Sequence, residues 1–168
     1  MNKEIRGEDI LDFAIEIEMN GYAFYTETAK KFDNLKTIKL FHILAEQELK
    51  HEMFFKQLKE KQPKFDTSET LEASYEIFKK EFLQTYTFGD SADTRNRIKS
   101  VASVEDAIDM AISFEKDTVV LYSSIKKHIK DDDQNLVDKI INQELGHIGR
   151  LLELKKNYNQ ELAKGEDD

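Results

Sequence analysis

Two copies of a Glu-x-x-His motif are the parts of this sequence best suited to chemistry. QELKH contains Glu48 and His51, and QELGH contains Glu144 and His147. Residues three apart on a helix share a face, so both side chains of a motif can reach one metal pair. Carboxylate oxygens with one imidazole nitrogen per metal suit Fe²⁺ or Mn²⁺. A further glutamate precedes each motif by about thirty residues, and the six candidate ligands are Glu18, Glu48, His51, Glu115, Glu144 and His147.

All six candidates interrupt apolar stripes of helical spacing. The stripes contain Phe41, Leu44, Phe55 and Leu58 around the first motif, Val137, Ile140, Leu151 and Leu154 around the second, Leu11, Ile15, Tyr22 and Tyr25 around Glu18, and Ile108, Ile112, Val119 and Tyr122 around Glu115. Such a stripe faces a protein core, where an uncompensated carboxylate is costly. Four carboxylates balance two divalent cations in charge. We therefore expect two metal ions per chain. Iron is the metal that we expect first, and manganese and zinc are the alternatives.

Two other interpretations of these charged residues remain open. They could form buried ion pairs, or the helical phase could be wrong and the charges could face water. One Glu-x-x-His motif would arise readily by chance in a chain that is 35% charged. Two motifs at the same phase of an apolar stripe, each preceded by a core-facing glutamate, favour the metal site.

Four long periodic segments must position these residues. We expect helices over about Asp9 to Lys31, Leu35 to Lys61, Ser103 to Ile129 and Asp131 to Tyr158. Pro63 ends the second, and Ser103 with Asp106 forms a capping box before the third. The connection of residues 62–102 contains a short helical candidate, Glu69 to Gln84, and then the turn-rich FGDSADTRNR. Its length allows the third helix to start at the same end of a bundle as the second.

The two halves of the chain resemble each other. DFAIEIEMNGYAFY begins at Asp12 and DMAISFEKDTVVLY begins at Asp109, an offset of 97 residues, whereas the two Glu-x-x-His motifs are offset by 96. Duplication of a helical hairpin would produce this pattern. It would also place equivalent ligands around a pseudo-twofold axis.

Composition excludes several other classes of protein. A length of 168 residues predicts one domain over residues 1–168, and the net charge of −9 argues against a nucleic-acid surface. No stretch approaches the about 18 apolar residues of a membrane span, and the start of the chain lacks a signal-peptide core, so we expect a soluble cytoplasmic protein without a membrane partner. The chain contains no cysteine, which leaves oxygen and nitrogen as metal ligands.

These residues resemble the rubrerythrins of the ferritin-like superfamily. The resemblance is carried by AIEIEMNGYAFY, LAEQELKH, AISFEKDTVVLY and IINQELGH and covers nearly the whole chain. It implies an all-α, ferritin-like four-helix bundle with one long crossover. By the same resemblance, Glu48 and Glu144 bridge two irons, Glu18 and Glu115 are terminal ligands, and His51 and His147 each bind one iron.

The resemblance also implies an activity. Rubrerythrins reduce hydrogen peroxide or oxidise Fe²⁺ with O₂, and are usually homodimers or small homo-oligomers. The alternative is a non-catalytic iron-handling protein, although ferritin cages generally lack the second Glu-x-x-His. Many rubrerythrins carry a Cys-bound iron in a rubredoxin-like domain, so a chain without cysteine needs an external electron donor such as a rubredoxin-like protein. Thr118 stands where peroxidase rubrerythrins tend to have a further glutamate, which puts efficient peroxidase activity in question.

Four further residues have a suggested place near the candidate ligands. Tyr25 and Tyr122 lie two turns beyond Glu18 and Glu115, and either donate hydrogen bonds to a ligand carboxylate of the opposite half or are ordinary core tyrosines. Gly21, like Gly146, lies inside a predicted helix, where a close helix approach would explain a glycine.

Overall fold

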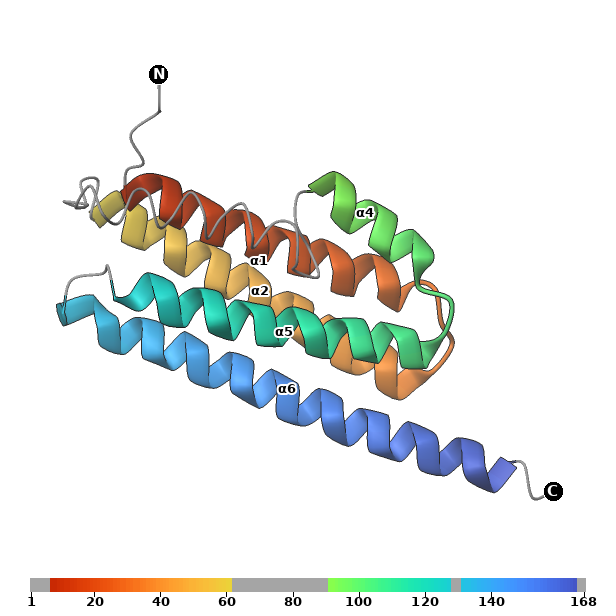
Figure 1. Ribbon diagram of the computed structural model, residues 1–168. Helices are drawn as coiled ribbons and strands as arrows, with labels where there is room; N and C mark the ends of the chain where they lie inside the picture. The colour runs from red at the N-terminus through yellow and green to blue at the C-terminus, as the bar shows by residue number, and fades with distance from the viewer. Residues whose placement is uncertain (1–6, 62–90, 128–130, 166–168) are drawn as a thin grey trace.

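The chain forms a bundle of four long helices with a shorter helix at its side (Figure 1). The computed structural model describes residues 7–61, 91–127 and 131–165. In these ranges every regular element is a helix: α1 Gly7–Ala29, α2 Leu35–Lys61, α4 Ser91–Ser100, α5 Val104–Lys126 and α6 Asp131–Gly165. The helix predicted over Glu69 to Gln84 lies outside the described residues. None of the described helices is both long enough and apolar enough to cross a membrane.

The long helices form two hairpins, α1 with α2 and α5 with α6. Across the bundle, α1 also contacts α5 and α2 also contacts α6. Helices α2 and α5 begin at the same end of the bundle, so the end of α2 and the start of α5 lie at opposite ends (Figure 1). This confirms the predicted ferritin-like bundle with one long crossover.

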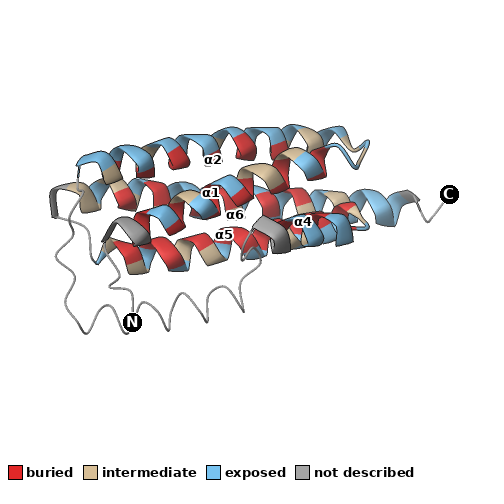
Figure 2. Cartoon of the chain, turned by 90° about the horizontal axis from the view of Figure 1, so that it is seen from above, coloured by how far each residue is buried: buried red, intermediate tan, exposed pale blue. Residues whose placement is uncertain are grey.

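Buried side chains line the inner faces of the long helices (Figure 2). The predicted stripes around the two Glu-x-x-His motifs are buried at every position. The stripes around Glu18 and Glu115 are less accurate, because Ile15, Tyr22 and Val119 are only half-buried. On α1 the core face turns instead toward Ala14, Ile17 and Phe24.

Side-chain caps set the starts of two helices. Ser103 accepts a hydrogen bond from the Asp106 backbone N–H at 3.0 Å, and Asp106 accepts one from the Ser103 N–H at 3.1 Å, so the predicted capping box at α5 is confirmed. Asn34 Oδ1 accepts a hydrogen bond from the Thr37 N–H at 3.0 Å at the start of α2. Both caps satisfy backbone donors that lack partners within the helix.

The prediction of a turn-rich segment at FGDSADTRNR is wrong for its second part, because Ser91–Ser100 is helix α4. Ser, Asp and Asn favour turns, but Thr94 and Ile98, four residues apart, bury one face of this helix. At its C-terminal end Lys31 Nζ donates to the carbonyl of Ile98 at 2.9 Å and to that of Val101 at 2.6 Å. Tertiary contacts therefore stabilise a helix that local propensity disfavours.

The predicted end of the fourth helix, at Tyr158, is also wrong. Helix α6 continues to Gly165 and projects beyond the rest of the bundle (Figure 1). Tyr158 is the last apolar residue to pack against the core, but the residues after it are good helix formers. An ion pair between Lys36 and Glu161 ties this extension to the start of α2.

Equivalent ion pairs in the two hairpins support the internal repeat. Lys59 contacts Asp12 at 2.5 Å, and Lys155 contacts Asp109 at 2.5 Å. The aspartates differ by the 97-residue offset and the lysines by the 96-residue offset. The repeat is thus present in the contacts as well as in the sequence.

The two glycines differ in their surroundings, which gives a paired prediction. A Cβ atom on Gly21 would lie 2.6 Å from the ring of Phe114, which is buried in the core, whereas a Cβ on Gly146 would meet nothing within 4 Å. The close approach is therefore confirmed for Gly21 and wrong for Gly146. We expect Gly21→Ala to lower the free energy of unfolding by about 1–3 kcal/mol. Gly146→Ala should raise it by about 0.5–1 kcal/mol, because alanine favours a helix.

Urea unfolding followed by circular dichroism measures both changes in the metal-free protein. Gly146→Ala serves as the matched control, since it makes the same substitution inside a helix. Equal stability of the two variants would contradict the close contact between α1 and α5.

Candidate metal centre

Six side chains converge at mid-height in the bundle. Helix α1 supplies Glu18 and α5 supplies Glu115, while α2 and α6 each supply one Glu and one His. The structure brings together all six of the candidates Glu18, Glu48, His51, Glu115, Glu144 and His147, and none is more than 2% exposed. His42, in contrast, is exposed and lies apart from this cluster.

The six residues form two overlapping groups. In each group one atom from every residue lies within 4.8 Å of the others: Glu18, Glu48, His51 and Glu144 form one group, and Glu48, Glu115, Glu144 and His147 form the other. Glu48 and Glu144 belong to both groups. Glu144 Oε1 lies 2.8 Å from His51 Nδ1, and its Oε2 lies 2.8 Å from His147 Nδ1. One carboxylate therefore faces both halves of the site.

Glu18 and Glu115 repeat this arrangement. Glu18 Oε2 is 3.6 Å from His51 Nδ1, and Glu115 Oε1 is 3.4 Å from His147 Nδ1. The imidazole rings stack with their centroids 5.8 Å apart. Each group thus offers three carboxylates and one ring nitrogen to a single point.

Each of the six candidate ligands has at least one oxygen or nitrogen atom that lacks a hydrogen-bond partner. Among the described residues this holds for both oxygens of Glu48 and of Glu144, for Oε2 of Glu18 and of Glu115, and for Nδ1 of His51 and of His147. Buried polar atoms almost always have hydrogen-bond partners, so a cluster of buried atoms without partners is typical of a site for an ion or a water molecule. Two divalent cations fit, because hard oxygens and imidazole nitrogens are their usual ligands.

Burial and mutual repulsion disturb the protonation of the carboxyl groups. Burial raises the pKa of Glu18 and of Glu48 well above the ordinary value, and the neighbouring carboxylates contribute to the rise. Burial and the charge of Glu144 raise the pKa of Glu115 to about 7. Burial alone would also raise the pKa of Glu144, but close contacts with both imidazoles outweigh it and lower this pKa to about 2.

The pKa values of the two histidines are shifted in the opposite direction to that of an isolated buried imidazole. Burial would lower the pKa of His51, but its contacts with Glu144 outweigh this and raise the pKa to about 9. For His147 the contacts with Glu115 and Glu144 outweigh burial in the same way and raise the pKa to about 10. Without a cation, protons must therefore balance the charge of the carboxylates.

Two buried tyrosines connect the halves of the site. Tyr25 on α1 donates a hydrogen bond to Glu115 Oε1 on α5, and Tyr122 on α5 donates one to Glu18 Oε1 on α1. Burial and the nearby carboxylates raise the pKa of both tyrosines, so both remain donors. Each tyrosine thus binds one oxygen of the Glu18 or Glu115 carboxylate and leaves the other oxygen without a hydrogen-bond partner among the described residues.

Sequence reasoning missed one polar neighbour of the ligands. Gln143 Oε1 lies 3.0 Å from His51 Nε2. The available signal was the glutamine that directly precedes Glu48 and Glu144 in both motifs. Thr118, the position singled out by comparison with peroxidases, donates its hydroxyl to the Glu115 carbonyl at 2.8 Å.

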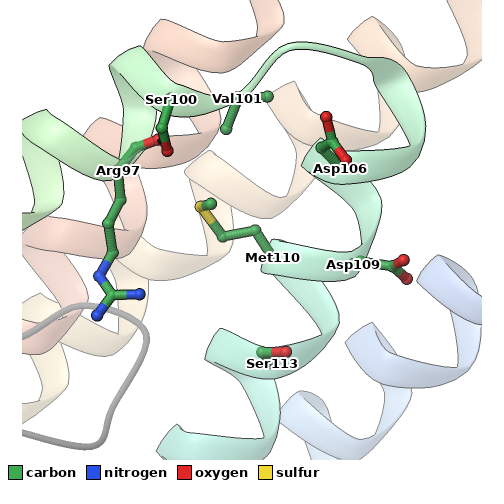
Figure 3. Close-up of a pocket in the computed structure, with 7 residues that line it drawn as sticks. All are labelled: Arg97, Ser100, Val101, Asp106, Asp109, Met110 and Ser113. Carbon is green, nitrogen blue, oxygen red and sulfur yellow. Dashed lines mark hydrogen bonds between the residues drawn. The ribbon is translucent and has the colours of Figure 1, made fainter.

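A surface pocket of about 450 Å³ lies between α4 and α5, away from these six residues (Figure 3). It is lined by Arg97, Ser100, Val101, Asp106, Asp109, Met110 and Ser113. Asp106 is engaged in the α5 cap and Asp109 pairs with Lys155. The buried cluster is therefore the principal candidate site.

Comparison with known proteins identifies the family. The family model described as Rubrerythrin matches residues 9–97, a stretch that includes Glu18, Glu48 and His51. The chain belongs to the rubrerythrin family. Within this family setting, the buried clusters of glutamate and histidine support two metal ions in the rubrerythrin bundle.

A solved structure supports the same fold. The rubrerythrin chain is similar to a ferritin-like diiron-carboxylate protein from Thermotoga maritima, with 29% sequence identity and a TM-score of 0.66. The match covers 93% of this chain and 98% of the other. The search of curated proteins gives no match.

Proposed function

We propose that this chain is a non-haem di-iron oxidoreductase that reduces hydrogen peroxide, or oxidises Fe²⁺ with O₂. One observation carries the proposal: two buried groups of candidate ligands share Glu48 and Glu144, and each of the six residues has at least one polar atom without a hydrogen-bond partner in the described residues. Such paired sites can supply electrons two at a time. The proposal assigns Glu48 and Glu144 as bridging ligands, Glu18 and Glu115 as terminal ligands, and one histidine to each metal.

The chain's own residues would prepare the reaction in two ways. Two Fe²⁺ ions, when bound, supply the two electrons that reduce one H₂O₂, with two protons, to two water molecules. Tyr25 and Tyr122 hold the terminal carboxylates in place through their hydroxyl protons. Aromatic rings enclose the tyrosines, since Tyr25 packs on Phe41 and Tyr122 packs on Phe55. This apolar surround excludes bulk water from the ligands.

The proposal includes a partner that returns electrons. The sequence contains no cysteine and so offers no thiolate-bound iron to deliver them. We assign this role to an external donor such as a rubredoxin-like protein.

Stopped-flow mixing of the Fe²⁺-loaded protein tests the activity. Samples are mixed separately with H₂O₂ and with O₂, and the ferric absorption is followed against Fe²⁺ in buffer alone. We expect protein-bound iron to be oxidised at least about 10-fold faster than free iron by one of the two oxidants. The Glu153→Gln protein, altered at an exposed position on α6, is the matched control and should keep this rate.

Rates no faster than those of free iron with both oxidants would remove the case for an oxidoreductase. If such a protein still held two ions per chain, the non-catalytic iron-handling function would take its place. A faster reaction with O₂ than with H₂O₂ would favour Fe²⁺ oxidation, in agreement with Thr118 at the position discussed above.

A further inference from the structure

The pseudo-twofold relation between the hairpins is closely obeyed around the metal centre. Glu18 corresponds to Glu115, and Tyr25 corresponds to Tyr122, each with an offset of 97 residues. Each tyrosine donates to the carboxylate of the other half. The ion pairs of Asp12 and Asp109 repeat as well. Symmetry therefore predicts that the outer ring nitrogens of the two histidines, their Nε2 atoms, have equivalent hydrogen-bond partners.

The relation fails at those outer nitrogens. His51 Nε2 lies 3.0 Å from Gln143 Oε1. The symmetry-equivalent bond would join His147 Nε2 to Gln47, but His147 Nε2 is buried and has no hydrogen-bond partner in the part of the chain that the structure describes. His147 is 0% exposed, so bulk water does not replace the missing acceptor.

The bond to Gln143 has a definite effect on His51. A carbonyl oxygen only accepts hydrogen bonds, so His51 Nε2 must carry the proton. In the neutral ring, which is the form that binds a metal ion, the lone pair then resides on Nδ1, which faces Glu144 at 2.8 Å and Glu18 at 3.6 Å. An acceptor on the outer nitrogen of a ligating histidine fixes the tautomer and ring orientation and increases ligand basicity. His147 receives none of this support.

We propose that Gln143 is a positioning residue that makes the two metal positions unequal. The position formed by Glu18, Glu48, His51 and Glu144 takes up the first metal ion and holds it more tightly. The position of His147 fills second. This inference rests on the proposed metal centre and deepens it, because it assigns an order of loading to two groups that carry the same set of ligand types.

Titration of the metal-free protein with Co²⁺ alone tests the inference. Visible absorption follows the loading, and competition with a chelator gives the two affinities. We expect two steps that differ by about 10-fold or more. Gln143→Leu should weaken the tighter step by about 10-fold to 100-fold and leave the weaker step unchanged. Gln143→Glu, which keeps an oxygen acceptor at this place, should restore the tighter step.

Gln47→Leu is the matched control, since it alters the equivalent glutamine of the other motif. It should change neither affinity. Two equal steps in the unaltered protein, or equal weakening by Gln47→Leu and Gln143→Leu, would overturn the inference while the metal centre stands. Absence of any Co²⁺ binding would overturn the metal centre itself, so the two failures are distinguishable.

Discussion

Exchanging Glu144 for glutamine should remove most metal from the protein. Its two oxygens face the two histidine Nδ1 atoms at 2.8 Å, and the residue belongs to both groups of ligand atoms. Glutamine has nearly the same shape but supplies neither a charge nor a second oxygen. We expect the affinity for both ions to fall by about 100-fold or more. Elemental analysis of protein purified without chelator, with chelator competition, measures the change.

A second glutamate on the same helix provides the control for this variant. Glu153 is exposed, and Glu153→Gln alters the net charge by the same amount. It should retain about two ions per chain, the number expected for this kind of bundle site. A Glu144→Gln protein that also kept both ions would show that Glu144 does not bridge them.

The metal-free protein should lose stability as the pH rises, whereas the affinity for metal should increase. The pKa of His51 is raised from 6.5 to about 9 and that of His147 from 6.5 to about 10, so both bind protons more tightly in the folded state. A raised pKa contributes stability that is complete below the unfolded value and is lost as the pH passes through the folded value. For the two histidines this loss falls between pH 6.5 and about 10.

The carboxyl groups extend the same trend to lower pH. The pKa of Glu115 is raised from 4.5 to about 7, and its contribution is lost over that range. Glu144 acts in the opposite direction, because its pKa is lowered to about 2 and its contribution is lost as the pH falls from 4.5 through that value. Stability of the metal-free protein should thus be greatest near pH 4.5 to 5 and should decline toward pH 10.

Metal ions compete with these protons for the same side chains. The affinity for metal should therefore depend on pH in the opposite direction to the stability of the metal-free protein. Deprotonated ligands bind cations, so affinity should rise over the range in which the metal-free protein weakens. Thermal unfolding of the metal-free and Zn²⁺-loaded proteins from pH 5 to pH 9 measures both effects. The control is His42→Gln, an exposed histidine outside the site. A metal-free protein whose stability did not fall between pH 6.5 and pH 9 would contradict the assigned protonation.

Periodicity together with charge was sufficient to place the cluster. The positions of Glu48, His51, Glu144 and His147 follow from apolar neighbours three and four residues away, because a helix has one core-facing side and the motif interrupts it. The 97-residue repeat then identified Glu18 and Glu115 as a matching pair. The bundle topology was predicted as well, because the length of the connection allows a crossover and the resemblance to rubrerythrins implies one.

Details that depend on tertiary contact could not be obtained in the same way. Helix α4 is formed by residues with turn propensity, and what stabilises it includes Lys31, which lies far away in the sequence. The bond from His51 to Gln143 joins α2 to α6, and nothing in either motif distinguishes Gln143 from Gln47. Gly21 and Gly146 look alike in the sequence, and only the position of Phe114 separates them.

The sharing of candidate ligands between the two hairpins affects how the protein unfolds. Each group of ligand atoms takes three residues from one hairpin and one from the other, and each tyrosine donates its hydrogen bond to the other hairpin. Each hairpin alone would therefore offer its ion an incomplete set of ligands. The loaded bundle should open as a single cooperative unit, and a cell that withholds metal would leave both hairpins less firmly joined at once.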